Sequence, residues 1–394
     1  MRHLPLPAAL SLAILTFATA SAQDSPSPTN EAPTATSPAA FVYVASNFSA
    51  INEIVGYAAA ANGKLTPLPG SPYPYSEDSL AATGDFLFGA ETNPIYIDSF
   101  SVASDGALTF LEATATRRGD CLGSISNLIL DHTGATLYGL NEDSTGTHCV
   151  DDALVSYEIE KPSGKLNYLG NTGFGSTAFE GVFNFQLPFS ANDKFAYVPA
   201  SFDPPATILG FERHSNGKLE FADTRGPMPK KEDDTYLPFL VATDPFNHVA
   251  AYVQAFNSKT GNEDGPPQIA TYTADASGNL STTSNFENMP KASIVDSLTD
   301  MKMSPTGKFL AVAGVGLQVL HYNGAEPAKD FVTLLPGKYI SAMAWDSNDH
   351  LYVLALESNM MYVYTVTSTS VSQAPGSPYK IEQPQAISVV IKNP

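Results

Sequence analysis

Charged side chains are scarce in this sequence of 394 residues. Aspartate, glutamate, lysine and arginine make up 15% of it, against roughly 25% in a typical soluble protein. Coiled coils and long exposed helices depend on such residues, so both are excluded. The 20 basic residues face 40 acidic ones, which gives a net charge of −20, and no more than two basic residues are adjacent. We therefore expect no nucleic acid partner, because phosphate groups would be repelled.

Cysteine and the usual metal or nucleophile motifs are also nearly absent. The sequence has two cysteines, no G-x-S-x-G segment, and histidines without metal-ligand spacing. Acidic residues gather in two segments but lack the order of a calcium-binding loop, and we expect them to be solvated: Glu142, Asp143, Asp151, Asp152, Glu263 and Asp264. We expect no metal site and no cofactor.

Long hydrophobic runs are missing except at the N-terminus. Arg2 precedes an apolar stretch from Ala8 to Ala18, and Ala20-Ser21-Ala22 is a small-residue cleavage site. The stretch is too short to span a bilayer. This predicts a signal peptide at 1–22, a secreted or periplasmic protein, and no transmembrane segment after cleavage; an N-terminal anchor is the alternative. Residues 23–40, rich in Pro, Ser, Thr and Ala, predict a disordered leader.

Short β-type segments with a recurring aromatic residue fill the rest of the chain. Aligned on their third position, they recur every 41 to 59 residues, at Tyr43, Phe88, Tyr138, Tyr197, Tyr252, Ala311 and Tyr352. An apolar segment and a tight turn precede most of them. A third segment and a Gly-x-Leu turn, such as Gly63-Lys64-Leu65, follow most of them. Units of this length, with four strands each, are typical of propeller blades.

The two ends of the repeat region complement each other. The first unit lacks an inner strand, whereas the last apolar segment, at about 386–391, has no partner strand after it. Pairing these ends would remove two exposed sheet edges. We therefore predict an all-β fold, a seven-bladed β-propeller with four-stranded blades over residues 41–394, closed by the C-terminal strand. Two tandem sandwiches are the alternative.

The repeated motifs resemble a known family. The Tyr-Val strands, the Gly-Lys-Leu turns and the Pro-Gly-Ser-Pro-Tyr segments at 69–73 and 375–379 are similar to those of the lactonase-type, YVTN-repeat propellers related to 6-phosphogluconolactonase. The resemblance covers about 41–394 and implies the same fold. It also implies a lactone-ring hydrolase, of the carboxylic ester hydrolase class.

The family's enzymes direct basic residues and a carboxylate into the central channel. The matching segments of this chain hold neither arginine nor histidine: Ser126-Asn127-Leu128, Val182-Phe183-Asn184, Tyr236-Leu237-Pro238, Leu298-Thr299-Asp300 and Ile340-Ser341-Ala342. The resemblance therefore implies no catalytic set residue by residue.

Long loops are expected on one face of the propeller, where binding commonly occurs. They carry a group of charged residues that predicts a ligand-binding set: Arg117, Arg118, Asp120, Glu180 and Arg225. Arginine pairs can clamp a carboxylate or a sugar acid. Ordinary surface ion pairing is the alternative. If the protein is an enzyme, Glu180 is the candidate base, with Arg117 or Arg118 as its cationic partner.

The two cysteines fall in loops expected on the same face of the third blade. An exported protein can oxidise such a pair, so we predict a disulfide between Cys121 and Cys149. Two functions remain open. The first is an exported, monomeric binding protein that presents its loops to a protein, a glycan or a small ligand. The second is a lactonase-like hydrolase or isomerase acting on a lactone or a sugar acid.

Overall fold

The computed structural model describes residues 37–48, 51–91, 96–116, 124–142, 153–173, 186–201, 206–230 and 234–391. The predicted signal peptide and most of the predicted leader lie outside these ranges. Within them, no helix is long and apolar enough to span a membrane. The regular structure is almost entirely β-strand, as the alternating and turn-rich sequence predicts.

The first half of the chain forms antiparallel four-stranded sheets. The first sheet has the order β26-β1-β2-β3, the second β4-β5-β6-β7 and the third β11-β10-β9-β8. Their strands are β26 (Pro384–Ile391), β1 (Ala40–Phe48), β2 (Ile51–Ala59), β3 (Leu65–Pro67), β4 (Ser79–Ala82), β5 (Phe86–Glu91), β6 (Tyr96–Val102), β7 (Leu108–Ala115), β8 (Ser124–Leu130), β9 (Thr136–Glu142), β10 (Ala153–Ile159) and β11 (Leu166–Gly173).

The second half continues the pattern with sheets β12-β13-β14 and β15-β16-β17-β18, and with a larger sheet from β19 to β24, to which β25 is added. The strands are β12 (Phe195–Ala200), β13 (Thr207–Arg213), β14 (Leu219–Gly226), β15 (Asp234–Thr243), β16 (His248–Asn257), β17 (Gln268–Ala274), β18 (Leu280–Ser281), β19 (Asp300–Met303), β20 (Phe309–His321), β21 (Lys329–Trp345), β22 (His350–Ala355), β23 (Met360–Val366), β24 (Val371–Gln373) and β25 (Tyr379–Lys380). One 3-10 turn, η1 (Leu356–Ser358), joins β22 to β23.

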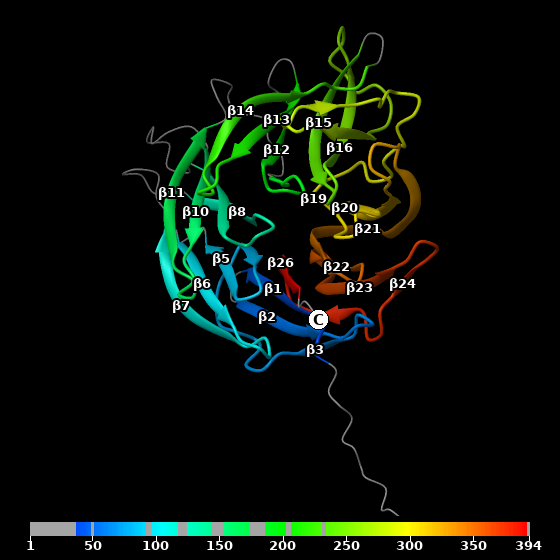
Figure 1. Ribbon diagram of the computed structural model, residues 1–394. Helices are drawn as coiled ribbons and strands as arrows, with labels where there is room; N and C mark the ends of the chain where they lie inside the picture. Colours follow the sequence, from blue (N-terminus) through cyan, green and yellow to red (C-terminus); the bar gives the residue numbers. More distant parts are fainter. Residues whose placement is uncertain are drawn as a thin grey trace, which may run out of the picture. The chain divides into compact units, whose positions relative to one another are not determined.

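The two ends of the chain meet in one sheet. β26 pairs antiparallel with β1, with Phe41 opposite Val390 and Val44 opposite Ile387. Figure 1 shows β26, in red, beside β1, in blue. Pairing covers the edge of β1, which would otherwise present unpaired backbone groups to solvent.

Buried apolar residues form clusters between successive sheets. Phe41 and Tyr43 of β1 pack with Leu87 of β5 and Phe100 of β6. On the other side of the same sheet, Val42 packs with residues of β22 and β23. Burying one such side chain contributes roughly 1.5–3 kcal/mol. Antiparallel sheets packed face to face in sequence order (Figure 1) are typical of a β-propeller.

The Gly-x-Leu turns connect neighbouring sheets. The Tyr43 hydroxyl donates a hydrogen bond of 2.7 Å to the carbonyl oxygen of Gly106, and Tyr138 does the same to Gly217. Gly106 has a φ of 87°, and a Cβ there would lie 2.9 Å from Cδ1 of Phe41. Glycine is therefore required at position 106 for two reasons: the positive φ, and the close approach of the adjacent sheet.

A buried polar network closes the turn between β21 and β22. His350 Nδ1 lies 2.8 Å from Asp346 Oδ2, and the Tyr352 hydroxyl donates to the same oxygen at 2.8 Å. The backbone N–H of His350 donates to Asp346 Oδ1. Burial alone would raise the pKa of Asp346, but the hydrogen bonds from His350 and Tyr352 hold that pKa below its ordinary value.

Candidate functional site

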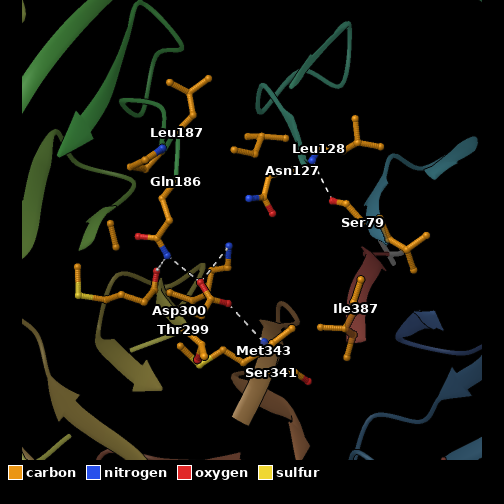
Figure 2. A pocket seen from close by; sticks show the side chains of 18 of the residues that line it. Ser79, Asn127, Leu128, Gln186, Leu187, Thr299, Asp300, Ser341, Met343 and Ile387 are labelled. Carbon is orange, nitrogen blue, oxygen red and sulfur yellow. Dashed lines mark hydrogen bonds and ion pairs between the residues drawn. The ribbon is translucent and has the colours of Figure 1, made fainter. Parts of the chain in front are cut away.

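A cavity of about 470 Å³ lies where the inner segments of the sheets meet. It is lined by residues of β4, β8, β15, β19, β21 and β26, and by the segment 186–188. Figure 2 shows side chains from these segments directed around one common space. The volume falls within the roughly 300–1,000 Å³ that small-molecule sites usually have.

The two charged residues of β19 face the cavity because side chains alternate along a strand. Asp300 and Lys302 are two residues apart in β19, so both side chains lie on the same face of the strand. Met301 points to the other face and is buried in the core cluster between β19 and β15. A short strand therefore contributes a charged pair to the cavity and an apolar residue to the core.

Asp300 contacts three other residues around the cavity. Its Oδ1 accepts a hydrogen bond of 2.7 Å from Nε2 of Gln186 and lies 3.5 Å from Nζ of Lys302. Its Oδ2 accepts from the backbone N–H of Met343 at 3.4 Å. Figure 2 shows these interactions converging on the carboxylate. Asp300 thus ties together β19, β21 and the segment 186–188.

Gln186 uses its whole amide for positioning. Its Oε1 accepts from the backbone N–H of Val241 at 3.1 Å, and Nε2 donates to the carbonyl oxygen of Met301 as well as to Asp300. The side chain is almost fully buried. Because its hydrogen-bonding groups are already engaged, Gln186 orients the carboxylate of Asp300 rather than offering groups to a ligand.

The opposite wall is held by hydroxyl groups. Ser79 Oγ accepts from the N–H of Leu128 at 2.9 Å, which joins β4 to β8. The Ser341 hydroxyl donates to the carbonyl oxygen of Pro384 at 2.8 Å, which joins β21 to β26. Beside Ser79, Figure 2 shows the Asn127 amide directed into the cavity. No residue in the described ranges forms a hydrogen bond with that amide.

The charge of the cavity is small. Among the described residues that line it, two are acidic, Asp78 and Asp300, and one, Lys302, is basic. None of these lining residues is arginine or histidine. Within the described ranges, no group of three or more His, Cys, Asp or Glu residues is arranged to hold a metal ion. The wall offers hydroxyl, amide and thioether groups, which suit hydrogen bonding to an uncharged molecule.

A buried carboxylic acid lies next to this wall. Glu77 is 0% exposed, and neither of its carboxyl oxygens has a hydrogen-bond partner among the described residues. Burial, with smaller contributions from Asp98, Glu91 and Asp78, raises the pKa of Glu77 to about 9. The carboxyl group is therefore protonated at neutral pH, because a buried carboxylate without hydrogen-bond donors has a higher free energy than the neutral acid.

The sheet geometry explains why the acid can be accommodated. A Cβ on Gly89 would lie 2.2 Å from Cδ of Glu77, so the carboxyl group packs on the bare backbone of β5. In the next sheet, Gly139 is covered in the same way by the side chain of Ile125. Glu77 therefore occupies a position that is apolar in the neighbouring sheet.

Most residues of the predicted ligand-binding set lie outside the described residues: Arg117, Arg118, Asp120 and Glu180. Arg225 lies in β14, opposite Leu209 of β13, and its side chain is outside the description. Cys121 and Cys149 also lie outside the described residues. The charged set and the disulfide stay predictions.

The cavity residues were only partly foreseeable. Asn127, Thr299, Asp300 and Ser341 fall in the segments that match the channel-lining positions of the lactonase-type family, and they line the cavity, although none of them was predicted as a binding or catalytic residue. Gln186 and Lys302 were missed. Strand alternation could have identified Lys302. It is two residues after Asp300 in a segment expected to form the inner strand of a blade, so the two side chains lie on the same face of that strand.

Comparison with known proteins supports the fold. No protein-family model and no curated protein matches the sequence. The crystal structure of a "putative 6-phosphogluconolactonase" from Bacteroides uniformis is 15% identical with a TM-score of 0.60, covering 89% of this chain and 99% of that chain. Another from Bacteroides fragilis is 14% identical with a TM-score of 0.57, covering 91% and 99%. A protein from Lactobacillus plantarum is 11% identical with a TM-score of 0.58, covering 90% and 99%. The chain thus has a lactonase-like β-propeller fold.

Proposed function

We propose that this protein is a binding protein that holds a small polar ligand in the central cavity. The observation that carries the proposal is the arrangement around Asp300. Gln186 and Met343 fix its carboxylate from two other segments, and that carboxylate in turn holds Lys302 at the cavity wall. Polar groups that are fixed in this way before a ligand arrives lose little entropy on binding.

The hydrogen-bonding groups left over support the same function. The Asn127 amide is directed into the cavity, and the Lys302 side chain is 47% exposed. Partly buried apolar residues complete the wall: Ile129, Met303 and Ile387. Small-molecule sites usually combine apolar side chains with a few well-placed polar groups. The larger polar share of this wall suits a polar ligand.

The only tryptophan makes the proposal directly testable. Trp345 Nε1 donates a hydrogen bond of 3.2 Å to the carbonyl oxygen of Lys302. A ligand that contacts Lys302 is expected to change the tryptophan fluorescence, and calorimetry would then give its affinity. Lys302→Met and Asn127→Ala should each weaken binding by about tenfold or more. Lys380→Met, at an exposed lysine in β25, is the matched control. Equal affinity in all variants would contradict the proposal.

Lactone hydrolysis is the second candidate. It is favoured by the likeness to the two Bacteroides structures. A pH-indicator assay with a panel of lactones tests it, and Glu180→Gln should abolish turnover if Glu180 is the base. No turnover across the panel would exclude this candidate.

We also propose that the sheets form a closed ring of seven blades. The Tyr322 N–H donates to the Lys308 carbonyl oxygen, so the residues just before and just after β20 are hydrogen-bonded to each other. The Val102 N–H donates to the Asp85 carbonyl oxygen in the same way, at the open end of the β5-β6 hairpin. This likeness supports treating β20 as a hairpin of two strands. β21 pairs first with β20 and then with β22, so it can serve two blades. The core cluster that joins β1 to β22 and β23 supports closure.

Export, which the sequence of residues 1–22 supports, and a monomeric state complete the proposal. Mass spectrometry of the secreted protein should find Gln23 as the first residue and, without reductant, a peptide pair linked through Cys121 and Cys149. Retention of residues 1–22 would contradict a cleaved signal peptide and favour the N-terminal anchor. Light scattering tests the monomer.

A further inference from the structure

We propose that the cavity selects a neutral polyhydroxylated molecule, such as a sugar or a cyclitol, and discriminates against sugar acids and sugar phosphates. This inference rests on the proposed binding function and identifies its ligand class. Asp300 is the residue that sets the selectivity, acting through Lys302.

The first argument is electrostatic. Lys302 is the one basic residue among the described lining residues, and its ammonium group lies 3.5 Å from Asp300 Oδ1. The carboxylate therefore neutralises the charge that would otherwise attract an anion. Asp78 adds a second negative charge to the same wall. Two acidic groups against one basic group leave the cavity formally negative by one charge, in a protein whose net charge is −20.

The second argument is the balance of donors and acceptors. Ser79 Oγ accepts from Leu128, so its hydroxyl proton is left to donate. The Ser341 hydroxyl donates to Pro384, so its oxygen is left to accept. The Asn127 amide can do both, and the Lys302 ammonium keeps N–H donors beyond its contact with Asp300. Neighbouring hydroxyl groups of a sugar each donate and accept, which matches this mixture. A phosphate or carboxylate only accepts.

The third argument is the apolar part of the wall. Ile129, Met303 and Ile387 are only partly buried and line the cavity, and Figure 2 shows Ile387 near the polar groups. A sugar or cyclitol ring has C–H groups that can pack on such side chains, while its hydroxyl groups reach the polar ones. A small inorganic anion would leave this apolar surface uncovered.

Asp300→Asn removes the negative charge at this position while keeping nearly the same side-chain size. The asparagine can keep its oxygen toward Gln186 and Lys302, so the substitution forfeits mainly the long 3.4 Å contact with the Met343 N–H. The formal charge of the wall changes from negative to neutral, and Lys302 is no longer compensated by a carboxylate. The variant should therefore gain affinity for anions while its affinity for neutral ligands changes little.

The experiment uses the mature protein and a panel of neutral hexoses, pentoses and inositols, each paired with its sugar acid or phosphate. Trp345 fluorescence and calorimetry give the affinities. We expect at least one neutral compound to bind at least about tenfold more tightly than its anionic counterpart, and Asp300→Asn to reduce that ratio by about tenfold. Lys380→Met is the control and should leave the ratio unchanged.

A second measurement needs no variant. The affinity of wild-type protein for the neutral compound should be independent of salt concentration, because no net charge pairing is involved. An anionic counterpart that binds as tightly as the neutral compound would overturn the ligand class and leave the binding function standing. No binding by any member of the panel would overturn the ligand class. Binding of other compounds that Lys302→Met does not weaken would overturn the cavity function itself.

Discussion

The carboxyl group of Glu77 lies directly on the backbone of Gly89, with Cδ only 2.2 Å from where a Cβ of residue 89 would be. Asp98 is the cross-strand partner of Gly89 in β6, so its side chain lies on the same face of the sheet. Burial first, and then Asp98 and Glu91, disfavour the ionised form of Glu77. Two consequences can be measured.

The stability of the protein should fall as pH rises through the neutral range. The pKa of Glu77 is about 9 in the folded chain, against an ordinary value of 4.5. Between these values the folded state keeps a proton that the unfolded state has lost, so each unit of pH weakens folding until the folded pKa is passed. Each unit of pKa displacement corresponds to about 1.4 kcal/mol, so the total effect amounts to several kcal/mol.

Glu77→Gln removes this titration. Urea unfolding from pH 5 to pH 9 should show a smaller loss of stability in the variant than in the wild type, and the variant should be the more stable protein at pH 8. Glu160→Gln, at an exposed glutamate after β10, is the control. Identical pH dependence in wild type and Glu77→Gln would refute a buried neutral acid at this position.

Gly89→Ala should be destabilising for steric reasons. The new methyl group would overlap the Glu77 carboxyl group, and overpacking a buried site typically costs about 1–3 kcal/mol. Gly84→Ala is the matched control, because a Cβ at Gly84 meets no atom within 4 Å. Thermal unfolding of the two variants compares them directly. The double variant Glu77→Ala/Gly89→Ala should recover part of the loss, and failure to recover any would argue against this contact.

The turn glycines allow backbone and packing effects to be separated. Gly106 and Gly261 both have positive φ, so an alanine at either position carries a backbone cost of roughly 1 kcal/mol. At Gly106 the Cβ would also lie 2.6 Å from Leu68 Cδ2, whereas at Gly261 it meets nothing within 4 Å. Chemical denaturation should therefore show a clearly larger loss for Gly106→Ala. Equal losses would mean that the turn does not pack tightly on the neighbouring sheet.

Asp346 should stabilise the protein above about pH 4 and lose that effect in acid. Its pKa is lowered in the folded state, so the contribution is present above the unfolded pKa and disappears as pH falls through the folded value. Asp346→Ala leaves His350 and the Tyr352 hydroxyl without their buried partner, which should cost about 1–3 kcal/mol or more at pH 7. Acid titrations of stability should show a smaller change in the variant. Asp85→Asn, at an exposed position, should behave like the wild type.

Local features were predictable because they depend on neighbours in sequence. Strand alternation and the Gly-x-Leu turns are written in a few consecutive residues, and Gly106 and Gly217 lie in turns of the expected kind. The family resemblance, and not this local logic, matched the segments of Asn127 and Asp300 to channel-lining positions, and both residues line the cavity. The charged loop residues proposed for binding, among them Arg117 and Glu180, rested on loop length alone and lie outside the described residues.

The repeat, the turn chemistry and the all-β class are determined by the sequence alone, because each of these is set by residues a few positions apart. The tertiary structure decided the rest. Gln186, Asp300 and Met343 are far apart in the chain, and they meet because separate sheets bring their inner segments to one cavity. Glu77 stands beside other polar residues in sequence and would be expected at the surface. Packing on Gly89 buries it, because desolvation depends on which strands surround a side chain and not on its sequence neighbours.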